Sequence, residues 1–144
     1  MTIVVRRATV DDAEDLARLN FEFNGGEPRQ GQDIKASLRS NQELVAVALM
    51  LDEVVAFGCA QSYRSFCYPD PYGEITEMYV SEAARRKGAA TALIAFLEQE
   101  LCCQGVTSVK ILTGNTNNPA LNTYQASGYI TSAEVMLQKK VRIY

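Results

Sequence analysis

A basic turn between a strand-like run and a helix-like run constrains this sequence more than any other feature. Residues 85–90 (Arg-Arg-Lys-Gly-Ala-Ala) follow the apolar run 75–80 and open the helical pattern 89–103. Backbone N–H groups at a helix start are unpaired and the helix dipole favours negative charge there. Gly88 would let an anion approach the backbone closely. The turn therefore predicts a phosphate site, although runs of cations are also commonly solvated turns.

This turn differs from two common phosphate-binding motifs. It is not a Walker loop, because no Gly-Lys-Ser/Thr follows four residues after a first glycine. It is not the dinucleotide fingerprint either, because that motif needs three glycines. The ligand that carries the phosphate must therefore be inferred from the sequence on either side of the turn.

Length and charge limit the classes of function. The 144 residues predict a single domain, 1–144, and the net charge of −3 disfavours a nucleic-acid partner. A mildly acidic chain instead favours cationic small molecules. No apolar run reaches the ~18 residues of a membrane helix, and no signal-peptide core opens the chain. We therefore expect a cytoplasmic protein with no membrane partner.

Cysteine and histidine usage narrows the chemistry. The four cysteines have no zinc-like spacing and are a poor disulfide framework, so we expect reduced thiols: Cys59, Cys67, Cys102 and Cys103. The chain has no histidine. That absence removes the commonest general base and the commonest metal ligand, and we expect no metal site.

Hydrophobic periodicity predicts a mixed α/β chain. We expect strands at 2–7, 43–51, 54–63, 74–80, 106–112, 129–130 and 135–141. Helices are expected at 10–24, 89–103 and 118–128, and a shorter helix that contains Ile34 and Leu38 is expected to end near Ser40. A hairpin turn is predicted at Asp52-Glu53 and an aromatic loop at 65–73. The alternation of strand and helix from 74 to 128 implies a parallel crossover beside the antiparallel hairpin.

A second motif follows at residues 117–129 (Asn-Asn-Pro-Ala-Leu-Asn-Thr-Tyr-Gln-Ala-Ser-Gly-Tyr). Together with the basic turn it resembles the GNAT superfamily of N-acetyltransferases. The family's acyl-CoA signature, Gln/Arg-x-x-Gly-x-Gly/Ala, matches at Arg85, Gly88 and Ala90. Its later pattern, Asn-x-x-Ala-x-x-x-Tyr-x-x-x-Gly-Phe/Tyr, matches at Asn117, Ala120, Tyr124, Gly128 and Tyr129. The resemblance implies the GNAT acyl-CoA N-acyltransferase fold, a mixed twisted sheet of about six to seven strands with helices on both faces.

The resemblance also implies where acetyl-CoA binds. In the family, the backbone of the strand before the turn hydrogen-bonds the pantetheine arm, and the N–H groups of the turn hold the pyrophosphate. The implied cofactor-binding residues are Met78, Tyr79, Val80, Arg85, Arg86, Lys87, Gly88, Ala89, Ala90, Thr91 and Asn117. Tyr124 would place its hydroxyl near the thioester sulfur as general acid, although a core aromatic would fit the same helical position.

The attacking amine needs a base or a water path to one. Two carboxylates on the strand before the turn, Glu77 and Glu74, are the catalytic candidates, and we favour Glu77. Their odd separation would normally place them on opposite faces, but a bulge, usual in this strand among relatives, would change that. Either acid could instead bind an ammonium group or be a solvated charge.

The acceptor pocket is predicted only from the family's architecture. Relatives contact the acceptor with the first helix and the following loop, which gives the candidates Phe21, Glu22, Phe23, Asn24, Tyr68 and Tyr72. Core packing is the favoured role for Phe23. The expected acceptor is a small-molecule or peptide amine, with a cationic small molecule favoured and a homodimer possible.

The sequence thus predicts an acetyl-CoA-dependent N-acetyltransferase that transfers the acetyl group to a primary amine by direct attack. The alternative is an acyl-CoA-binding sensor or regulatory module without turnover, which would keep the cofactor cleft. Tyr124 and the carboxylate-bearing strand favour the enzyme.

Overall fold

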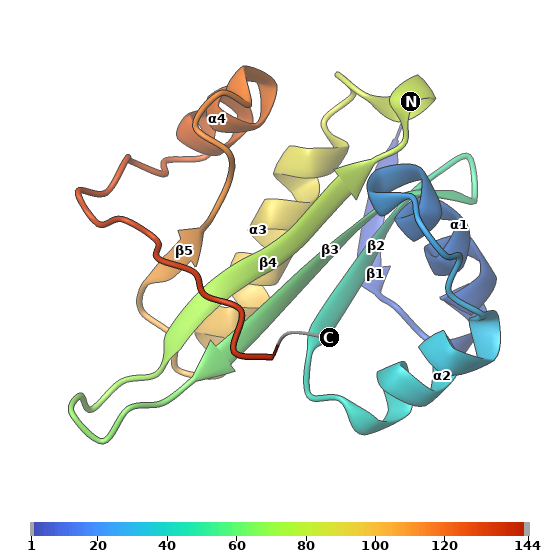
Figure 1. Cartoon of the computed structure of the whole chain (residues 1–144). Coiled ribbons are helices and arrows are strands. Elements are labelled where there is room, and N and C mark those ends of the chain that lie inside the picture. The colour runs from blue at the N-terminus through green and yellow to red at the C-terminus, as the bar shows by residue number, and fades with distance from the viewer. Residues whose placement is uncertain (1, 143–144) are drawn as a thin grey trace.

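A five-stranded mixed sheet with helices on both faces forms the molecule (Figure 1). The computed structural model describes residues 2–142. Its strands are β1 (Ile3–Arg7), β2 (Leu44–Met50), β3 (Glu53–Tyr63), β4 (Tyr72–Val80) and β5 (Val109–Ile111). They pair in the order β1-β2-β3-β4-β5, with every pair antiparallel except β4 and β5.

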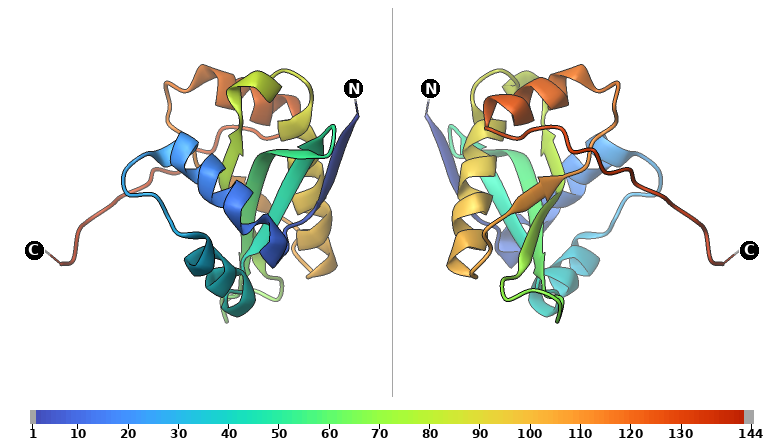
Figure 2. Two further views of the ribbon diagram at one scale, coloured as in Figure 1. Left: turned by 90° about the vertical axis from the view of Figure 1, so that its right-hand side faces the viewer. Right: turned by 90° about the vertical axis from the view of Figure 1, so that its left-hand side faces the viewer.

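The helices divide between the two faces of the sheet, as Figure 2 shows. The α-helices are α1 (Ala13–Asn24), α2 (Gly31–Ser40), α3 (Ala89–Cys103) and α4 (Asn118–Ala126), and short 3-10 turns are η1 (Val10–Asp12) and η2 (Glu82–Ala84). The helix α3 covers one face, and α1 and α2 cover the other. Helices on both faces of a mixed sheet confirm the predicted fold class.

The side of the sheet covered by α3 holds the larger apolar core. Leu93, Leu97 and Leu101 repeat at helical spacing along α3 and are fully buried. They pack on strands whose inward positions are alanines, including Ala46 and Ala60. Small side chains on the sheet let the helix pack closely, so this face is filled by hydrocarbon.

The chain enters α1 through a capping box that also ties the helix to β1. Thr9 and Asp12 satisfy each other's backbone N–H groups, the N–H of Thr9 donating to Asp12 Oδ2 at 2.8 Å. Arg6 donates to both oxygens of the same carboxylate at 2.7 and 2.9 Å. This hydrogen bonding to Arg6 lowers the pKa of Asp12, which is buried. Gly25, with φ of 64°, ends the helix where the sequence predicts a stop.

The β2–β3 hairpin turns one residue earlier than predicted. Leu51 and Asp52 have φ values of 52° and 62°, so they form the turn, and Glu53 already belongs to β3. Two consecutive positive φ values match the right-handed twist of the flanking strands. Asp52 tolerates this conformation well, which explains why the turn includes it.

The predicted sheet of six to seven strands is wrong for the described part of the chain, which contains five. The closing strands predicted at 129–130 and 135–141 are irregular, and the predicted strand 106–112 shortens to β5. The apolar residues that suggested the closing strands are exposed: Ile130 at 89%, Val135 at 83% and Leu137 at 89%. Alternating hydrophobicity is insufficient for a strand when no neighbouring strand pairs with it. Within residues 2–142, no helix is long and apolar enough to cross a membrane.

Candidate active site

A bulge in β4 brings the two candidate carboxylates to one face. Glu77 pairs with Cys59, whereas Ile75 pairs with Ala60, so Thr76 is an extra residue in β4. Ile75 points into the core under α3, and its neighbour Glu74 therefore points to the opposite face. Past the bulge Glu77 points to that same face, where it lines a pocket beneath α1 and α2. The bulge expected in this strand is present.

The edge of β4 that faces β5 is open beyond the bulge. Within the described residues, β5 pairs only with Gly73, Glu74 and Ile75. From Glu77 to Val80, β4 pairs with β3 alone among the described strands, and β5 and α4 diverge from it (Figure 1). Thr76 Oγ1 is buried at the start of this open edge and has no hydrogen-bond partner in residues 2–142. The predicted pantetheine-binding residues, Met78 to Val80, lie on this edge.

The basic turn connects the open edge to α3 and leaves helix donors uncapped. Gly88 is the N-cap of α3 with φ of 90° and provides no side-chain hydrogen bond. A Cβ atom built on Gly88 would meet nothing within 4 Å. Arg86 and Lys87 are exposed beside it. Open space, free N–H groups and two cations fit a phosphate group.

Arg85, which matches the first position of the acyl-CoA signature, is exposed but bonds the end of β4. Its Nε donates to the carbonyl of Val80 at 2.9 Å, and its guanidinium lies 5.6 Å from the ring centroid of Tyr79. The side chain therefore fixes the turn against the end of β4. The cations left free to face an anion are Arg86 and, more loosely held by a 3.3 Å bond to Ala83, Lys87.

The helix α4 carries the second motif across the opening from β4. Asn117 caps this helix, its side chain accepting from the N–H of Ala120 at 3.4 Å. Tyr124 is half-buried against the core, and burial raises the pKa of its hydroxyl. Within residues 2–142 that hydroxyl makes no hydrogen bond, whereas Tyr129 donates to Glu98 at 2.8 Å. The hydroxyl of Tyr124 is thus protonated and has no hydrogen-bond partner among the described residues.

A pocket of about 220 Å³ lies between α1, α2 and the sheet. It is lined by Leu16, Asn20, Asn24, Arg29, Ile34, Ser37, Leu38, Glu43, Val45, Phe57, Cys59 and Glu77. Sequence reasoning identified Glu77 and Asn24 but missed Glu43. Burial raises the pKa of Glu43, and the charge of Glu77 adds to this effect. The signal for Glu43 was only its position ahead of an apolar strand, which does not reveal a pocket.

Apart from Asn24, the predicted acceptor residues lie outside this pocket. The ring of Phe23 stacks on that of Tyr79, with 5.2 Å between the ring centroids. The hydroxyl of Tyr79 donates to Glu22 at 3.1 Å. The rings of Tyr68 and Tyr72 contact each other edge to face near the other end of β4, with 5.5 Å between the ring centroids. Phe21 is exposed on α1, and none of these five residues lines the pocket with Glu77. The structure therefore does not bring the predicted acceptor set together.

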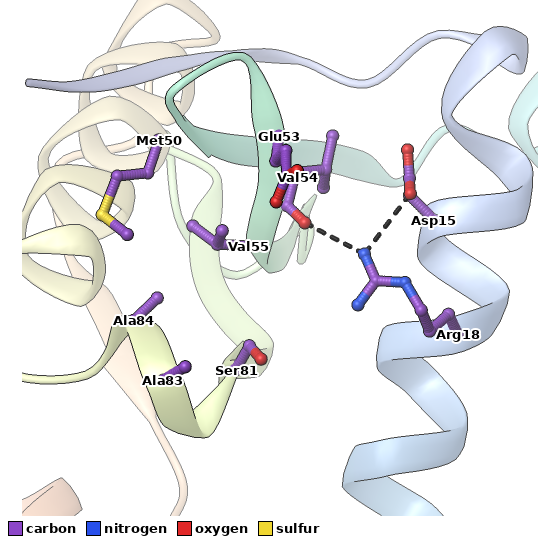
Figure 3. Close-up of a pocket in the computed structure, with 9 residues that line it drawn as sticks. All are labelled: Asp15, Arg18, Met50, Glu53, Val54, Val55, Ser81, Ala83 and Ala84. Atoms are coloured by element: carbon purple, nitrogen blue, oxygen red, sulfur yellow. Dashed lines mark hydrogen bonds and ion pairs between the residues drawn. The ribbon is translucent and has the colours of Figure 1, made fainter.

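A larger cavity of about 500 Å³ lies elsewhere, between α1, the start of β3 and the residues after β4 (Figure 3). Arg18 occupies its wall and donates to Val54 O at 3.1 Å and to Asp15 at 3.3 Å. The lining contains none of the residues predicted for catalysis or cofactor binding. Arg18 and Asp15 already pair with each other, and none of the predicted site residues is present, so the smaller pocket is the better candidate for an acceptor.

The comparison with protein families now adds a decisive observation. Residues 10–129 match the model of the acetyltransferase (GNAT) family, which is most of the chain. The chain belongs to the GNAT acetyltransferase family. As a GNAT acetyltransferase it is an enzyme that transfers an acetyl group to an amine.

Solved structures confirm the fold of this GNAT chain. An aminoglycoside acetyltransferase from an uncultured soil metagenomic sample, in complex with sisomicin, is 17% identical, with a TM-score of 0.83 over 98% of this chain and 97% of that one. AAC(6')-Iy, in complex with a CoA bisubstrate analogue, is 19% identical, with a TM-score of 0.84 over 97% of this chain and 99% of that one. No curated protein sequence matches the chain.

Proposed function

We propose that this GNAT enzyme transfers the acetyl group of acetyl-CoA to a primary amine of a cationic small molecule by direct attack. The observation that carries the proposal is the course of β4. One edge of this strand is open and runs into an uncapped, basic helix start, and the strand's face presents Glu77 to a pocket. One strand thus connects a donor site to an acceptor site.

The donor site fits acetyl-CoA in its chemistry. The backbone groups of Met78 to Val80 that bond neither β3 nor Arg85 would hold an extended amide chain as an added strand. The N–H groups from Arg86 to Thr91 would hold the pyrophosphate, and the open space at Gly88 admits it. When bound, acetyl-CoA supplies an activated thioester. Asn117 already caps α4 through its side chain, and any bond to pantetheine would add to that role.

Two side chains would transfer the protons of the acetyl-transfer reaction. Tyr124 would donate a proton to the leaving thiolate, and its raised pKa keeps the hydroxyl protonated for this role. Glu77 would accept a proton from the attacking amine, directly or through water, because it is exposed and lines the pocket. Glu74 is the weaker candidate for base, since Lys110 lies 3.8 Å from its carboxylate.

Two matched measurements test the proposal. Acetyl-CoA binding is measured by calorimetry, and CoA release is then measured with a panel of amines: putrescine, n-butylamine, spermidine, an aminoglycoside, free amino acids and a lysine-containing peptide. Turnover with the cationic small molecules is expected. Binding of acetyl-CoA with no turnover across the panel would contradict the proposal and favour an acyl-CoA-binding module. Turnover with the peptide alone would move the acceptor to proteins.

A further inference from the structure

The pocket between α1, α2 and the sheet holds two carboxylates that no basic side chain neutralises. Within residues 2–142, neither Glu43 nor Glu77 forms an ion pair. The single basic residue of the lining is Arg29, which is exposed in the connection between α1 and α2. Solvent screens an exposed guanidinium strongly. Glu77 is exposed and screened as well, but the lining holds two carboxylates and one guanidinium, so it favours a cation.

Strand register explains why these two acids share one pocket. Cys59 in β3 pairs with Val45 on one side and with Glu77 on the other. Glu43 precedes Val45 by two residues and so lies on the same face. The buried thiol of Cys59 lies between the acids and within hydrogen-bonding reach of Glu43. The carboxylates enter the pocket from opposite sides of one cysteine.

The electrostatics of this arrangement favour a cation. Burial and the nearby charge of Glu77 both raise the pKa of Glu43, so ionising both acids is costly without a counter-charge. A bound ammonium group would relieve this repulsion. The neutral part of the lining also contains hydrogen-bonding amides, with Asn24 donating to Asn20 at 2.7 Å. A cationic ligand would find both charge and polar partners there.

The size of the pocket limits the ligand. Its volume of about 220 Å³ is below the roughly 300 Å³ at which pockets for drug-sized ligands begin. The aliphatic side chains of Leu16, Ile34 and Val45 form part of the wall. A short aliphatic chain with an amino group at each end matches the volume, the apolar wall and the two acids.

Building on the proposed function, we infer that Glu43 is a specificity-determining residue that binds a second ammonium group of the acceptor, so that the enzyme prefers a short diamine to a monoamine. Glu77 faces the amine that is acetylated, and Glu43 holds the other end of the chain. The acceptor is thus selected by the two acids together, although only Glu77 takes part in the proton transfer.

The test compares putrescine with n-butylamine, which has the same carbon chain and one amino group fewer. Wild-type enzyme is expected to show the higher kcat/KM with putrescine. Glu43→Gln is expected to lower the ratio of the two kcat/KM values about tenfold to a hundredfold, the effect of losing one charge-assisted hydrogen bond. Glu27→Gln removes the same charge from an exposed position outside the pocket and is expected to keep the ratio within about twofold.

Other outcomes are equally informative. An equal loss for both amines in Glu43→Gln would overturn the inference, because it would show a structural role. A loss in Arg29→Gln with no loss in Glu43→Gln would also overturn it, in favour of a carboxylate-bearing acceptor. If neither amine reacts while another amine of the panel does, the inference alone fails. If no amine reacts although acetyl-CoA binds, the proposed function fails with it.

Discussion

The two halves of β4 differ in what they do for the molecule. Before the bulge, Gly73 to Ile75 pair with β3 on one edge and with β5 on the other. After it, Glu77 to Val80 pair with β3 alone. The first half is closed by strands and side chains, whereas the second half has an open edge beside exposed cations and a carboxylate-lined pocket. The closed half is tied into the sheet on both edges, whereas the open half has one edge that no described strand covers.

The bulge at Thr76 is what permits this division within one strand. It places Glu74 and Glu77 on one face although an odd number of residues separates them. Glu74, in the closed half, lies 3.8 Å from Lys110, and Glu77, in the open half, has no such partner in residues 2–142. Two chemically identical side chains thus acquire different environments from the pairing of the strand that carries them.

The largest effect is expected at the turn that ends the open half. Gly88→Glu should reduce acetyl-CoA affinity more than a hundredfold, because a carboxylate would occupy the space and repel the phosphates. Gly25→Glu is the matched control, since Gly25 also has a positive φ and open space around it but ends α1. Calorimetric titration with acetyl-CoA measures both. Equal affinities in the two variants would contradict the phosphate site.

The second-largest effect on the enzyme is expected from a substitution on α4. Tyr124→Phe should lower kcat about a hundredfold while acetyl-CoA affinity stays within a few-fold, because the general acid is lost and the ring remains. Tyr129→Phe is the control for the loss of a tyrosine hydroxyl from the same region, where the hydroxyl bonds Glu98 instead. Steady-state kinetics with the best amine measure both. Unchanged turnover in Tyr124→Phe would remove the acid assignment and leave the fold intact.

Substituting each of the two acids of β4 in turn compares the two halves of the strand. Glu77→Gln should lower kcat/KM at least tenfold, because Glu77 lines the pocket, and Glu74→Gln should lower it less, because Glu74 lies beside Lys110. Both substitutions keep the shape and remove one charge. Kinetics measured against pH, with the same amine, provide the readout. The reverse order of effects would move the base to the closed half.

Much of this division could be predicted from the sequence. The basic turn and the apolar run before it placed α3 at Ala89–Cys103, as observed, and the resemblance to the family pointed to the edge of β4. These features are local, because a turn, a cap and a helical repeat each occupy neighbouring residues. The bulge was expected from the family, and the strand pairing shows it at Thr76.

What the sequence did not predict depends on partners far away in the chain. Glu43 enters the site only because α1 and α2 pack over the start of β2, and no neighbouring residue indicates this. Phe23 was a candidate for the acceptor with core packing favoured, and which aromatic ring it would stack on, Tyr79, could not be read from neighbouring residues. The alternating residues 135–141 have strand periodicity, but no strand in the described chain pairs with them. Tertiary neighbours decide each of these cases.

The smallest effect tests the closed half. A Cβ atom on Gly73 would come within 2.8 Å of Val106 Cγ1 and 3.1 Å of Leu101 Cδ1, both in the core between β4 and α3. Gly73→Ala should therefore reduce the free energy of unfolding by about 1–2 kcal/mol through overpacking. Denaturant titration measures this change, and acetyl-CoA affinity at low denaturant should stay within about twofold. A marked loss of affinity at unchanged stability would show that the two halves of β4 are not independent, because the bulge would then transmit strain from one to the other.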